Sequence, residues 1–299
     1  MQRLYLIPFP IKHLLFIVNP RSGTDRVKAI EAVLETRLDK NLFRYEIQLT
    51  ECAGHGTDLA RAAAEAGAYA VVAVGGDGSV ADVAKGLYGT ETALGILPKG
   101  SGNGFARSLG IPLALAGAVD ILNKDRLLKV DVGFANEQLF LSNAGVAFDA
   151  EVTRLFAGST RRGFRTYTEI ILQNLFTYKA RQWQLRVDGK EMTEDAFMVV
   201  VANGQQFGYN FKIAPGADYT DGLFDLVVVR RFPHIAAPFI ALDSLLGRMH
   251  RNPYVETRQA REIEISHPEL KIFHTDGDPY ACDGKVVFRI ESQALSVLC

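Results

Sequence analysis

Cysteine is scarce in this chain of 299 residues. Only Cys52, Cys282 and Cys299 occur, and no two of them form a Cys-x-x-Cys pair. A sparse and odd set of cysteines argues against a disulfide framework and favours a reducing compartment. The six histidines also lack the spacing of metal ligands. The sequence therefore excludes a small disulfide-stabilised fold and does not predict a zinc site.

The chain also has no large excess of charge of either sign and no long apolar run. Lys and Arg number 33 against 34 Asp and Glu, so the net charge is −1 and no global basic field attracts nucleic acid. No stretch reaches the ~20 apolar residues of a spanning helix. The apolar start of the chain is broken by Pro8 and Pro10 and has no signal-peptide pattern. We expect a cytoplasmic protein without nucleic-acid partners, which meets a membrane only at its surface.

The pattern of apolar residues divides the sequence into two parts. Up to residue 122, short apolar runs alternate with helical patterns, and we predict strands over 13–18, 44–50, 70–74 and 93–97. Repeated strand–helix units of this kind predict a parallel sheet with helices on both faces. After about residue 129, short strand-like runs dominate, with helices expected over 164–178 and 236–249. We therefore predict an α/β domain over residues 1–128 and a β-rich, mainly antiparallel domain over 129–287.

Glycine-rich loops follow three of the predicted parallel strands. Glycine lets a backbone approach an anion closely, and a following helix offers free N–H donors. One such loop is explained equally well by a tight turn, whereas three at equivalent strand ends favour a polyphosphate site. The loops are Asn19-Pro20-Arg21-Ser22-Gly23, Gly75-Gly76-Asp77-Gly78-Ser79 and Gly100-Ser101-Gly102-Asn103-Gly104.

Asp77 is the carboxylate of the second loop. A carboxylate beside a phosphate is repelled unless a cation intervenes, so Asp77 is interpreted as a Mg²⁺ ligand or a proton acceptor. The alternative is that Asp77 caps the predicted helix over 80–87. Function is favoured over capping, since Ser79 could cap that helix equally well.

The ordered motifs NPRSG, GGDGS, LGILPKGSGNGFARSLGIP and DGDP resemble the catalytic-domain family of diacylglycerol kinases and sphingosine kinases. The resemblance runs from about residue 14 through nearly all of the chain. It implies a NAD kinase- and phosphofructokinase-like α/β domain followed by a β-rich domain, and a tail over 288–299 that returns to the first domain. It also implies an ATP- and Mg²⁺-dependent kinase that phosphorylates a hydroxyl of a diacylglycerol- or sphingosine-like lipid.

The resemblance assigns roles to particular residues. Asp278, the third residue of the Asp276-Gly277-Asp278 motif, is the expected proton acceptor, and Asp77 and Asp276 complete the expected catalytic set. A second pair, Asp283-Gly284, precedes the cationic Lys285 and is interpreted as a hairpin turn. The expected nucleotide site comprises Asn19, Pro20, Arg21, Ser22, Gly23, Thr50, Gly75, Gly76, Gly78, Ser79, Gly100, Ser101 and Asn103.

A second-domain loop resembles the family's structural Mg²⁺ site. Asp221 would bind through its side chain, and Asp218 and Leu223 through their carbonyl oxygens, which suits a hard cation. The alternative is an Asp-Gly turn that enters a strand. Asp149 lies in a stretch that resembles the part of the family facing the lipid head group, although a polar residue there could equally end a strand.

Four departures from the family pattern occur. Ser79 replaces Thr, Ala81-Asp82 replaces Asn-Glu, Gly104 stands where Asp is frequent, and Asp278 replaces a longer Glu. A NAD kinase, which shares the GGDG motif, and a non-catalytic lipid- or nucleotide-binding relative therefore remain as alternatives.

Partners beyond the nucleotide and the lipid are less defined. A homodimer is compatible with the sequence. For contact with a membrane surface, one candidate is a basic and aromatic cluster made of Arg161, Arg162, Arg165, Phe164 and Tyr167, whose alternative is a solvated helix start.

Overall fold

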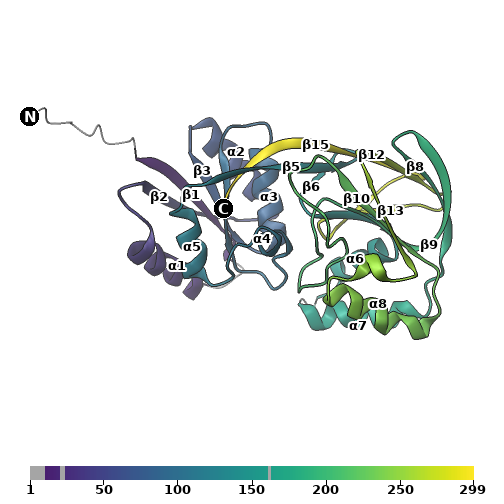
Figure 1. Cartoon of the computed structure of the whole chain (residues 1–299). Coiled ribbons are helices and arrows are strands. Elements are labelled where there is room, and N and C mark those ends of the chain that lie inside the picture. Colours follow the sequence, from purple (N-terminus) through teal and green to yellow (C-terminus); the bar gives the residue numbers. More distant parts are fainter. Residues whose placement is uncertain (1–10, 21–23, 161–162) are drawn as a thin grey trace, which may run out of the picture.

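The computed structural model describes residues 11–20, 24–160 and 163–299. Two lobes stand side by side, joined by a long pair of strands at the top of Figure 1. The predicted nucleotide-site residues Arg21, Ser22 and Gly23 lie outside the described residues, as do Arg161 and Arg162. In the part that is described, no helix has the length and apolar character needed to cross a membrane.

The first lobe is an α/β domain with a parallel sheet in the order β4-β3-β1-β2. Its inner strands are buried on both faces, since every residue of β3 and β4 is buried, as expected where helices cover both sides. The strands are β1 (Lys12–Val18), β2 (Phe43–Leu49), β3 (Ala70–Gly75) and β4 (Ala93–Pro98). The helices are α1 (Thr24–Arg37), α2 (His55–Glu65), α3 (Asp77–Leu87), α4 (Gly104–Ser108) and α5 (Leu115–Leu122).

The second lobe is an antiparallel β-rich domain with helices packed at its base (Figure 1). Its longest internal strand, β9, pairs with β7 and β8 on one side and with β10 on the other. The strands are β5 (Leu127–Ala135), β6 (Gln138–Phe140), β7 (Asn143–Ala147), β8 (Arg181–Val187), β9 (Lys190–Ala202), β10 (Phe224–Arg230), β11 (Val255–Ala260), β12 (Glu262–Ser266), β13 (Ile272–Thr275) and β14 (Asp278–Ala281). The helices are α6 (Phe148–Ala157), α7 (Phe164–Leu175) and α8 (Ala237–Leu245), with short 3₁₀ turns η2 (His234–Ala236) and η3 (Met249–Arg251).

Strand β15 (Lys285–Leu298) connects the two lobes. It pairs with β12 in the second domain, with β5 along most of its length, and with β4 of the first domain at Val297 and Leu94. The fold class expected from the sequence is confirmed. The exact boundary at residue 128 stays a prediction, because β5 and β15 run through the junction.

A buried carboxylate fixes the middle of this ribbon. The pairing of β15 with β5 shifts register between Glu291 and Leu295. Opposite this bulge, Asp131 is fully buried, and its two carboxylate oxygens accept the N–H groups of Gln293 and Gly222, both at 2.7 Å. Asp131 thereby ties the bulge to a loop of the second domain and holds the junction in one geometry.

Candidate active site

The loops after β3 and β4 are packed backbone against backbone. A Cβ atom on Gly76 would lie 3.1 Å from the Cα of Gly100, and a Cβ on Gly100 would overlap Gly76. The N–H of Lys99 donates to the carbonyl of Gly75 at 2.7 Å and joins the two strand ends. The protein itself therefore requires glycine at residues 76 and 100.

Gly78 is different. It is exposed in the first turn of α3, and a Cβ built there meets nothing within 4 Å. Glycine in a helix is less favourable than alanine by about 1 kcal/mol, so its presence is not explained by packing. A ligand that approaches the backbone at this point would explain it.

Asn103 shapes the third loop. Its side chain is buried, its backbone is left-handed with φ of 51°, and its amide both accepts from the N–H of Gly100 at 3.1 Å and donates to that residue's carbonyl at 2.8 Å. These bonds leave Ser101, which is exposed, at the outer tip of the loop. Asn103 is therefore positioned to stiffen the loop, whereas Ser101 is free to meet a ligand.

Asp77 does not cap its own helix. The N-cap of α3 is Gly76, which makes no side-chain capping bond, and Asp77 is the first helical residue. Its Oδ1 accepts the N–H of Phe105 at 3.3 Å, at the start of α4, and burial raises the pKa of Asp77. Asp77 therefore bonds to the start of α4 and does not cap α3. The alternative in which Asp77 caps the helix over 80–87 was wrong. Oδ2 faces Gly102, where a Cβ would lie 3.1 Å away.

The remaining first-domain residues gather at the same edge of the sheet. Asn19 and Pro20 follow β1, and the N–H of Thr50 donates to the carbonyl of Val18 at 3.0 Å. A Cβ on Gly56 would lie 3.3 Å from the Cβ of Asp82 and 3.8 Å from the methyl carbon of Thr50. The described residues of the predicted nucleotide site are thus placed on one edge, together with Asp82, which had appeared only as a departure from the family pattern.

The second domain presents its acidic motif as a tight hairpin. Asp276 and Gly277 have φ of 48° and 90°, and Thr275 pairs with Asp278, so the two residues form the loop between β13 and β14. Asp276 turns inward, where its carboxylate accepts the N–H groups of Leu141 at 2.6 Å, Ser142 at 2.8 Å and Asn143 at 3.0 Å. Burial raises its pKa, and these donors oppose the rise. Asp276 therefore anchors the hairpin.

Asp278 is left free. It is exposed at the start of β14 and has no hydrogen-bond or ion-pair partner among the described residues. Two observations place it beside α3 of the other domain. Burial raises the pKa of Asp82, with the nearby charge of Asp278 adding to the rise, and the hydroxyl of Tyr280 lies 3.4 Å from Nζ of Lys85. Asp278 thus faces the Gly-rich edge across the junction.

The second Asp-Gly pair is not a hairpin turn, so that interpretation was wrong. Among the described strands, β14 pairs with β13 and β15 pairs with β12, not with each other. Asp283 is exposed and receives a 2.6 Å bond from Nζ of Lys271, which lowers the pKa of the carboxyl group. This pair lies in the connection between β14 and β15, where Asp283 faces solvent.

The predicted metal loop folds back on itself. Asp218 Oδ1 accepts from the N–H and hydroxyl of Thr220, at 2.9 and 2.8 Å, and Asp221 Oδ1 accepts from the N–H of Leu223 at 2.9 Å. Burial and the neighbouring Asp221 raise the pKa of Asp225 to about 6. The Mg²⁺ site expected at Asp221, Asp218 and Leu223 stays a prediction.

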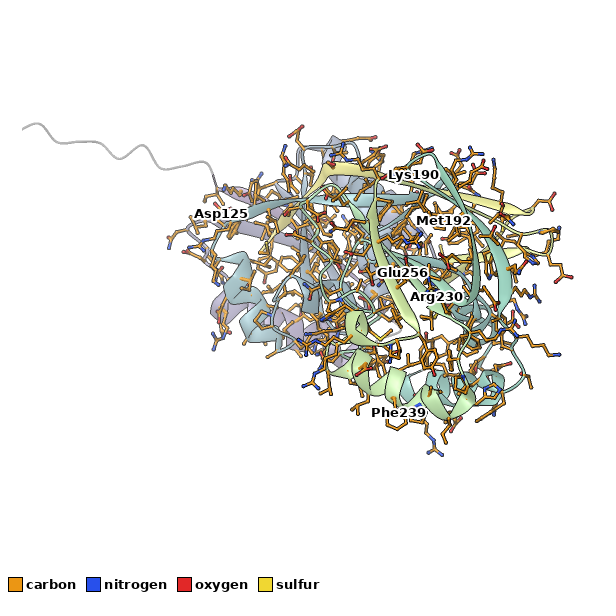
Figure 2. The ribbon with its side chains drawn as sticks, turned by 45° about the vertical axis from the view of Figure 1, so that its right-hand side comes forward. Asp125, Lys190, Met192, Arg230, Phe239 and Glu256 are labelled. Atoms are coloured by element: carbon orange, nitrogen blue, oxygen red, sulfur yellow. The ribbon has the colours of Figure 1, made fainter. Side chains whose placement is uncertain are left out.

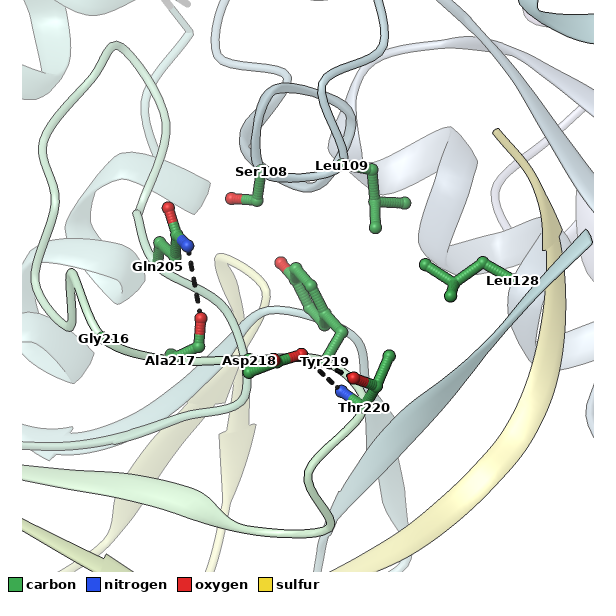
Figure 3. A pocket seen from close by; sticks show the side chains of 9 residues that line it. All are labelled: Ser108, Leu109, Leu128, Gln205, Gly216, Ala217, Asp218, Tyr219 and Thr220. Carbon is green, nitrogen blue, oxygen red and sulfur yellow. Dashed lines mark hydrogen bonds between the residues drawn. The ribbon is translucent and has the colours of Figure 1, made fainter.

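Among the described residues, no three His, Cys, Asp or Glu side chains lie close enough together to hold a metal ion. The expected site, with one carboxylate and two carbonyls, is of another kind. Asp218 also borders a cavity of about 360 Å³ at the domain junction. Figure 3 shows the cavity with Tyr219 rising into it and with the bonds from Thr220 to Asp218. Its lining is Ser108, Leu109, Leu128, Gln205, Gly216, Ala217, Asp218, Tyr219 and Thr220, and it includes no residue of the Gly-rich loops.

Asp149 does not end a strand. It lies in the first turn of α6, buried, 2.9 Å from Nε2 of His274, and burial raises its pKa. A Cβ on Gly145 would overlap its carboxylate. The sequence did not single out His274, since its partner lies on a distant helix. The pair supports β13 two residues before Asp276.

Two family models match the chain. Residues 13–135 match the diacylglycerol kinase catalytic domain, and residues 142–299 match the YegS C-terminal NAD kinase β-sandwich-like domain. A Chromohalobacter salexigens protein named "Probable lipid kinase YegS-like" is 32% identical over 239 residues, covering 78% of this chain and 77% of its own. The diacylglycerol kinase of Bacillus subtilis is 26% identical over 273 residues, or 90% of each chain.

A solved structure of a diacylglycerol kinase from Bacillus anthracis has a TM-score of 0.74 to this chain at 22% identity, with 96% of each chain covered, and so shares the fold. Gly-rich loops at strand ends that face an acidic hairpin can hold a phosphate donor beside a proton acceptor, as phosphoryl transfer requires. This chain belongs to the diacylglycerol kinase and YegS family of lipid kinases, as the resemblance in its motifs predicted.

Proposed function

We propose that this lipid kinase transfers the terminal phosphoryl group of ATP, with Mg²⁺, to a hydroxyl of a diacylglycerol- or sphingosine-like lipid. The observation that carries the proposal is the contrast within one hairpin, where Asp276 is bound by three N–H donors and Asp278 is unbound and faces α3. A general base must be free to reach the hydroxyl, and Asp278 meets that condition.

Each part of the site has a proposed task. The backbone after β3 and β4 holds the phosphates, with Gly78 allowing close approach and Ser101 at the loop tip. Asp77 would hold Mg²⁺ near the phosphates, where the ion would neutralise developing charge. Asp77 holds the second and third loops together through Phe105 and faces the nucleotide. Asp278 takes the proton from the attacking hydroxyl.

The rival functions are less well supported. A NAD kinase shares the GGDG motif and a related fold, but the relatives reported above are named as lipid and diacylglycerol kinases. A non-catalytic relative has no need of an unbound carboxylate at Asp278. We further propose that the enzyme is cytoplasmic and works at a membrane surface. The expected homodimer stays a prediction.

The direct test uses the purified chain, ATP and Mg²⁺ with a panel of diacylglycerols, sphingoid bases and NAD, and reads phosphorylated products by mass spectrometry. We expect a phosphorylated lipid and no NADP. Formation of NADP alone would contradict the proposal. The variant Asp77→Asn should lose transfer while keeping its fold, and wild-type turnover in that variant would remove Asp77 from the mechanism.

Gly78→Ala tests the nucleotide site separately from chemistry. Because a Cβ there is unobstructed, alanine should leave the free protein as stable as the wild type or more so, by up to about 1 kcal/mol. It should nevertheless weaken ATP binding, measured by calorimetry. Gly76→Ala is the matched control, since it should destabilise the protein. Unchanged ATP affinity in Gly78→Ala would exclude a phosphate at this position.

A further inference from the structure

The exposed apolar side chains of this protein are unevenly distributed. Of eleven large hydrophobic residues that are exposed in the described part of the chain, seven lie on α7, η2, α8 and the residues that follow α7 and α8. Scattered exposed hydrophobics are normal, whereas a contiguous group marks an interaction surface. The group is Leu172, Phe176, Ile235, Phe239, Leu242, Leu245 and Leu246. We call it the α7/α8 face.

Helix α8 is apolar on most of its surface, so Ile240 packs against the core while other apolar residues face solvent. Ile235, Phe239, Leu242 and Leu246 follow one another at helical spacing and are exposed, with Ile235 at 80% and Phe239 at 64%. The residue of α8 that is buried is Ser244, whose hydroxyl donates to the carbonyl of Lys212 at 3.3 Å. A helix that only covers a core would not also leave this row of large apolar residues exposed.

The two helices form one surface. The ring of Phe176, just after α7, lies 5.1 Å from the ring of His234 at the start of η2. Figure 1 shows α7 and α8 side by side along the base of the second domain, and Figure 2 shows Phe239 at the outer edge of α8. Leu172 and Phe176, one helical turn apart, extend the apolar stripe of α8 onto α7.

The charge around this face is positive. Residues 163–179 and 230–251 hold six Lys or Arg and two Asp or Glu, and the acidic partners of Arg230 and Arg231 lie outside these ranges. Arg165, Arg230 and Arg231 pair with acidic residues. In the described structure, Lys179, Arg248 and Arg251 are exposed and have no acidic partner within ion-pair distance. An apolar face edged by free cations is complementary to an anionic lipid surface.

We propose that the α7/α8 face docks this enzyme on an anionic bilayer, with Phe239 and Leu242 entering the headgroup boundary. A second copy of the chain is the rival occupant, but a two-fold pairing through this face would oppose the free cations of one copy to those of the other. Of the basic and aromatic cluster expected at the start of α7, Tyr167 packs on Phe156 with ring centroids 5.5 Å apart and is therefore not available for insertion, while Arg161 and Arg162 lie outside the described residues. The inference rests on the proposed function only in that a lipid kinase must reach a bilayer.

The test compares the wild type with the double variant Phe239→Gln/Leu242→Gln, since glutamine is polar and keeps helix propensity. Co-sedimentation is measured with phosphatidylcholine vesicles and with vesicles that also contain phosphatidylglycerol. We expect the wild type to prefer the anionic vesicles. Each of the two replacements should weaken binding to them by at least about tenfold, so the losses multiply in the double variant. Leu113→Gln, on an exposed leucine of the first domain, is the matched control and should bind as the wild type does.

Arg248→Gln/Arg251→Gln should remove the preference for anionic vesicles. Equal binding by wild type and the Phe239/Leu242 variant would overturn the proposal, as would equal loss in the control. A wild-type dimer that this variant converts to a monomer would assign the face to a second copy instead. Kinase assays on a short-chain acceptor without a bilayer separate docking from function. If the variant is active there and inactive on vesicles, docking is supported, whereas a wild type that binds vesicles but phosphorylates no lipid would refute only the proposed function.

Discussion

The Asp-Gly pairs at Asp276-Gly277 and Asp283-Gly284 have the same composition and opposite surroundings. The first closes a hairpin in which one carboxylate is held by three backbone N–H groups and leaves Asp278 facing the other domain. The second is a crossover whose carboxylate pairs with Lys271 in solvent. The comparison shows that an Asp-Gly dipeptide favours a change of chain direction but does not determine its surroundings. The strands that pair on either side determine whether the turn becomes part of a site.

The largest expected difference concerns catalysis. Asp278→Asn removes the proposed base and should lower kcat by about 10²–10⁴-fold, with little change in ATP affinity. Asp278→Glu restores the longer residue of the family pattern and should retain or raise activity. Steady-state kinetics on one accepted lipid measure both. If Asp278→Asn is fully active, the base lies elsewhere, and the two Asp-Gly pairs do not differ in catalytic function.

The next effect is on stability. Asp276→Ala leaves three N–H groups without their charged acceptor and should lower the free energy of unfolding by about 3 kcal/mol. Urea denaturation gives the value from the shift of the midpoint at constant slope. Asp276→Asn, which keeps one acceptor oxygen, is the control and should lose less. An Asp276→Ala protein as stable as the wild type would mean that the hairpin is held by other contacts.

The glycine of each Asp-Gly pair provides a further test of the difference between the two turns. Gly277 and Gly284 have φ of 90° and 75°, and neither would place a Cβ closer than 3.8 Å to another atom. Alanine at either position should therefore cost only backbone strain, about 1–2 kcal/mol. Thermal unfolding should show similar losses in the two variants. Only Gly277→Ala should also reduce kcat, because it displaces Asp278, and a parallel loss in Gly284→Ala would contradict this.

The smallest effect is expected at the second carboxylate. Asp283→Asn breaks one exposed ion pair, and such pairs contribute about 0–1 kcal/mol. Kinetics and unfolding should both match the wild type within error. A large loss of kcat here would transfer the proposed base to the crossover and reverse the comparison.

The sequence was most informative where local pattern and tertiary structure agree. The predicted strands over 70–74 and 93–97 correspond to β3 and β4, since buried parallel strands are continuous apolar runs between glycine-rich loops. The helices expected over 164–178 and 236–249 exist as the shorter α7 and α8. Glycine and the flanking polar residues set such ends only to within a turn.

The sequence was least informative where a residue's partner is distant. Asp77 and Phe105 are on different loops, and Asp149 meets His274 across the second domain, so no local pattern predicted either bond. The hairpin was assigned to the wrong Asp-Gly pair for the same reason, because strand pairing is decided by neighbours that are not adjacent in sequence. The outward apolar stripe of α8 has a normal helical period, and only the packing shows which face is exposed.

The ribbon of β5 and β15 has a consequence for synthesis on the ribosome. Leu295, Val297 and Leu298 belong to the core of the first domain, yet the ribosome makes them after every other described strand. Until they emerge, β4 remains an open sheet edge on a half-built domain, for many seconds at about 5–20 residues per second. Folding of the first domain is therefore coupled to synthesis of the whole second domain, and a nascent chain stalled before β15 is expected to need chaperones.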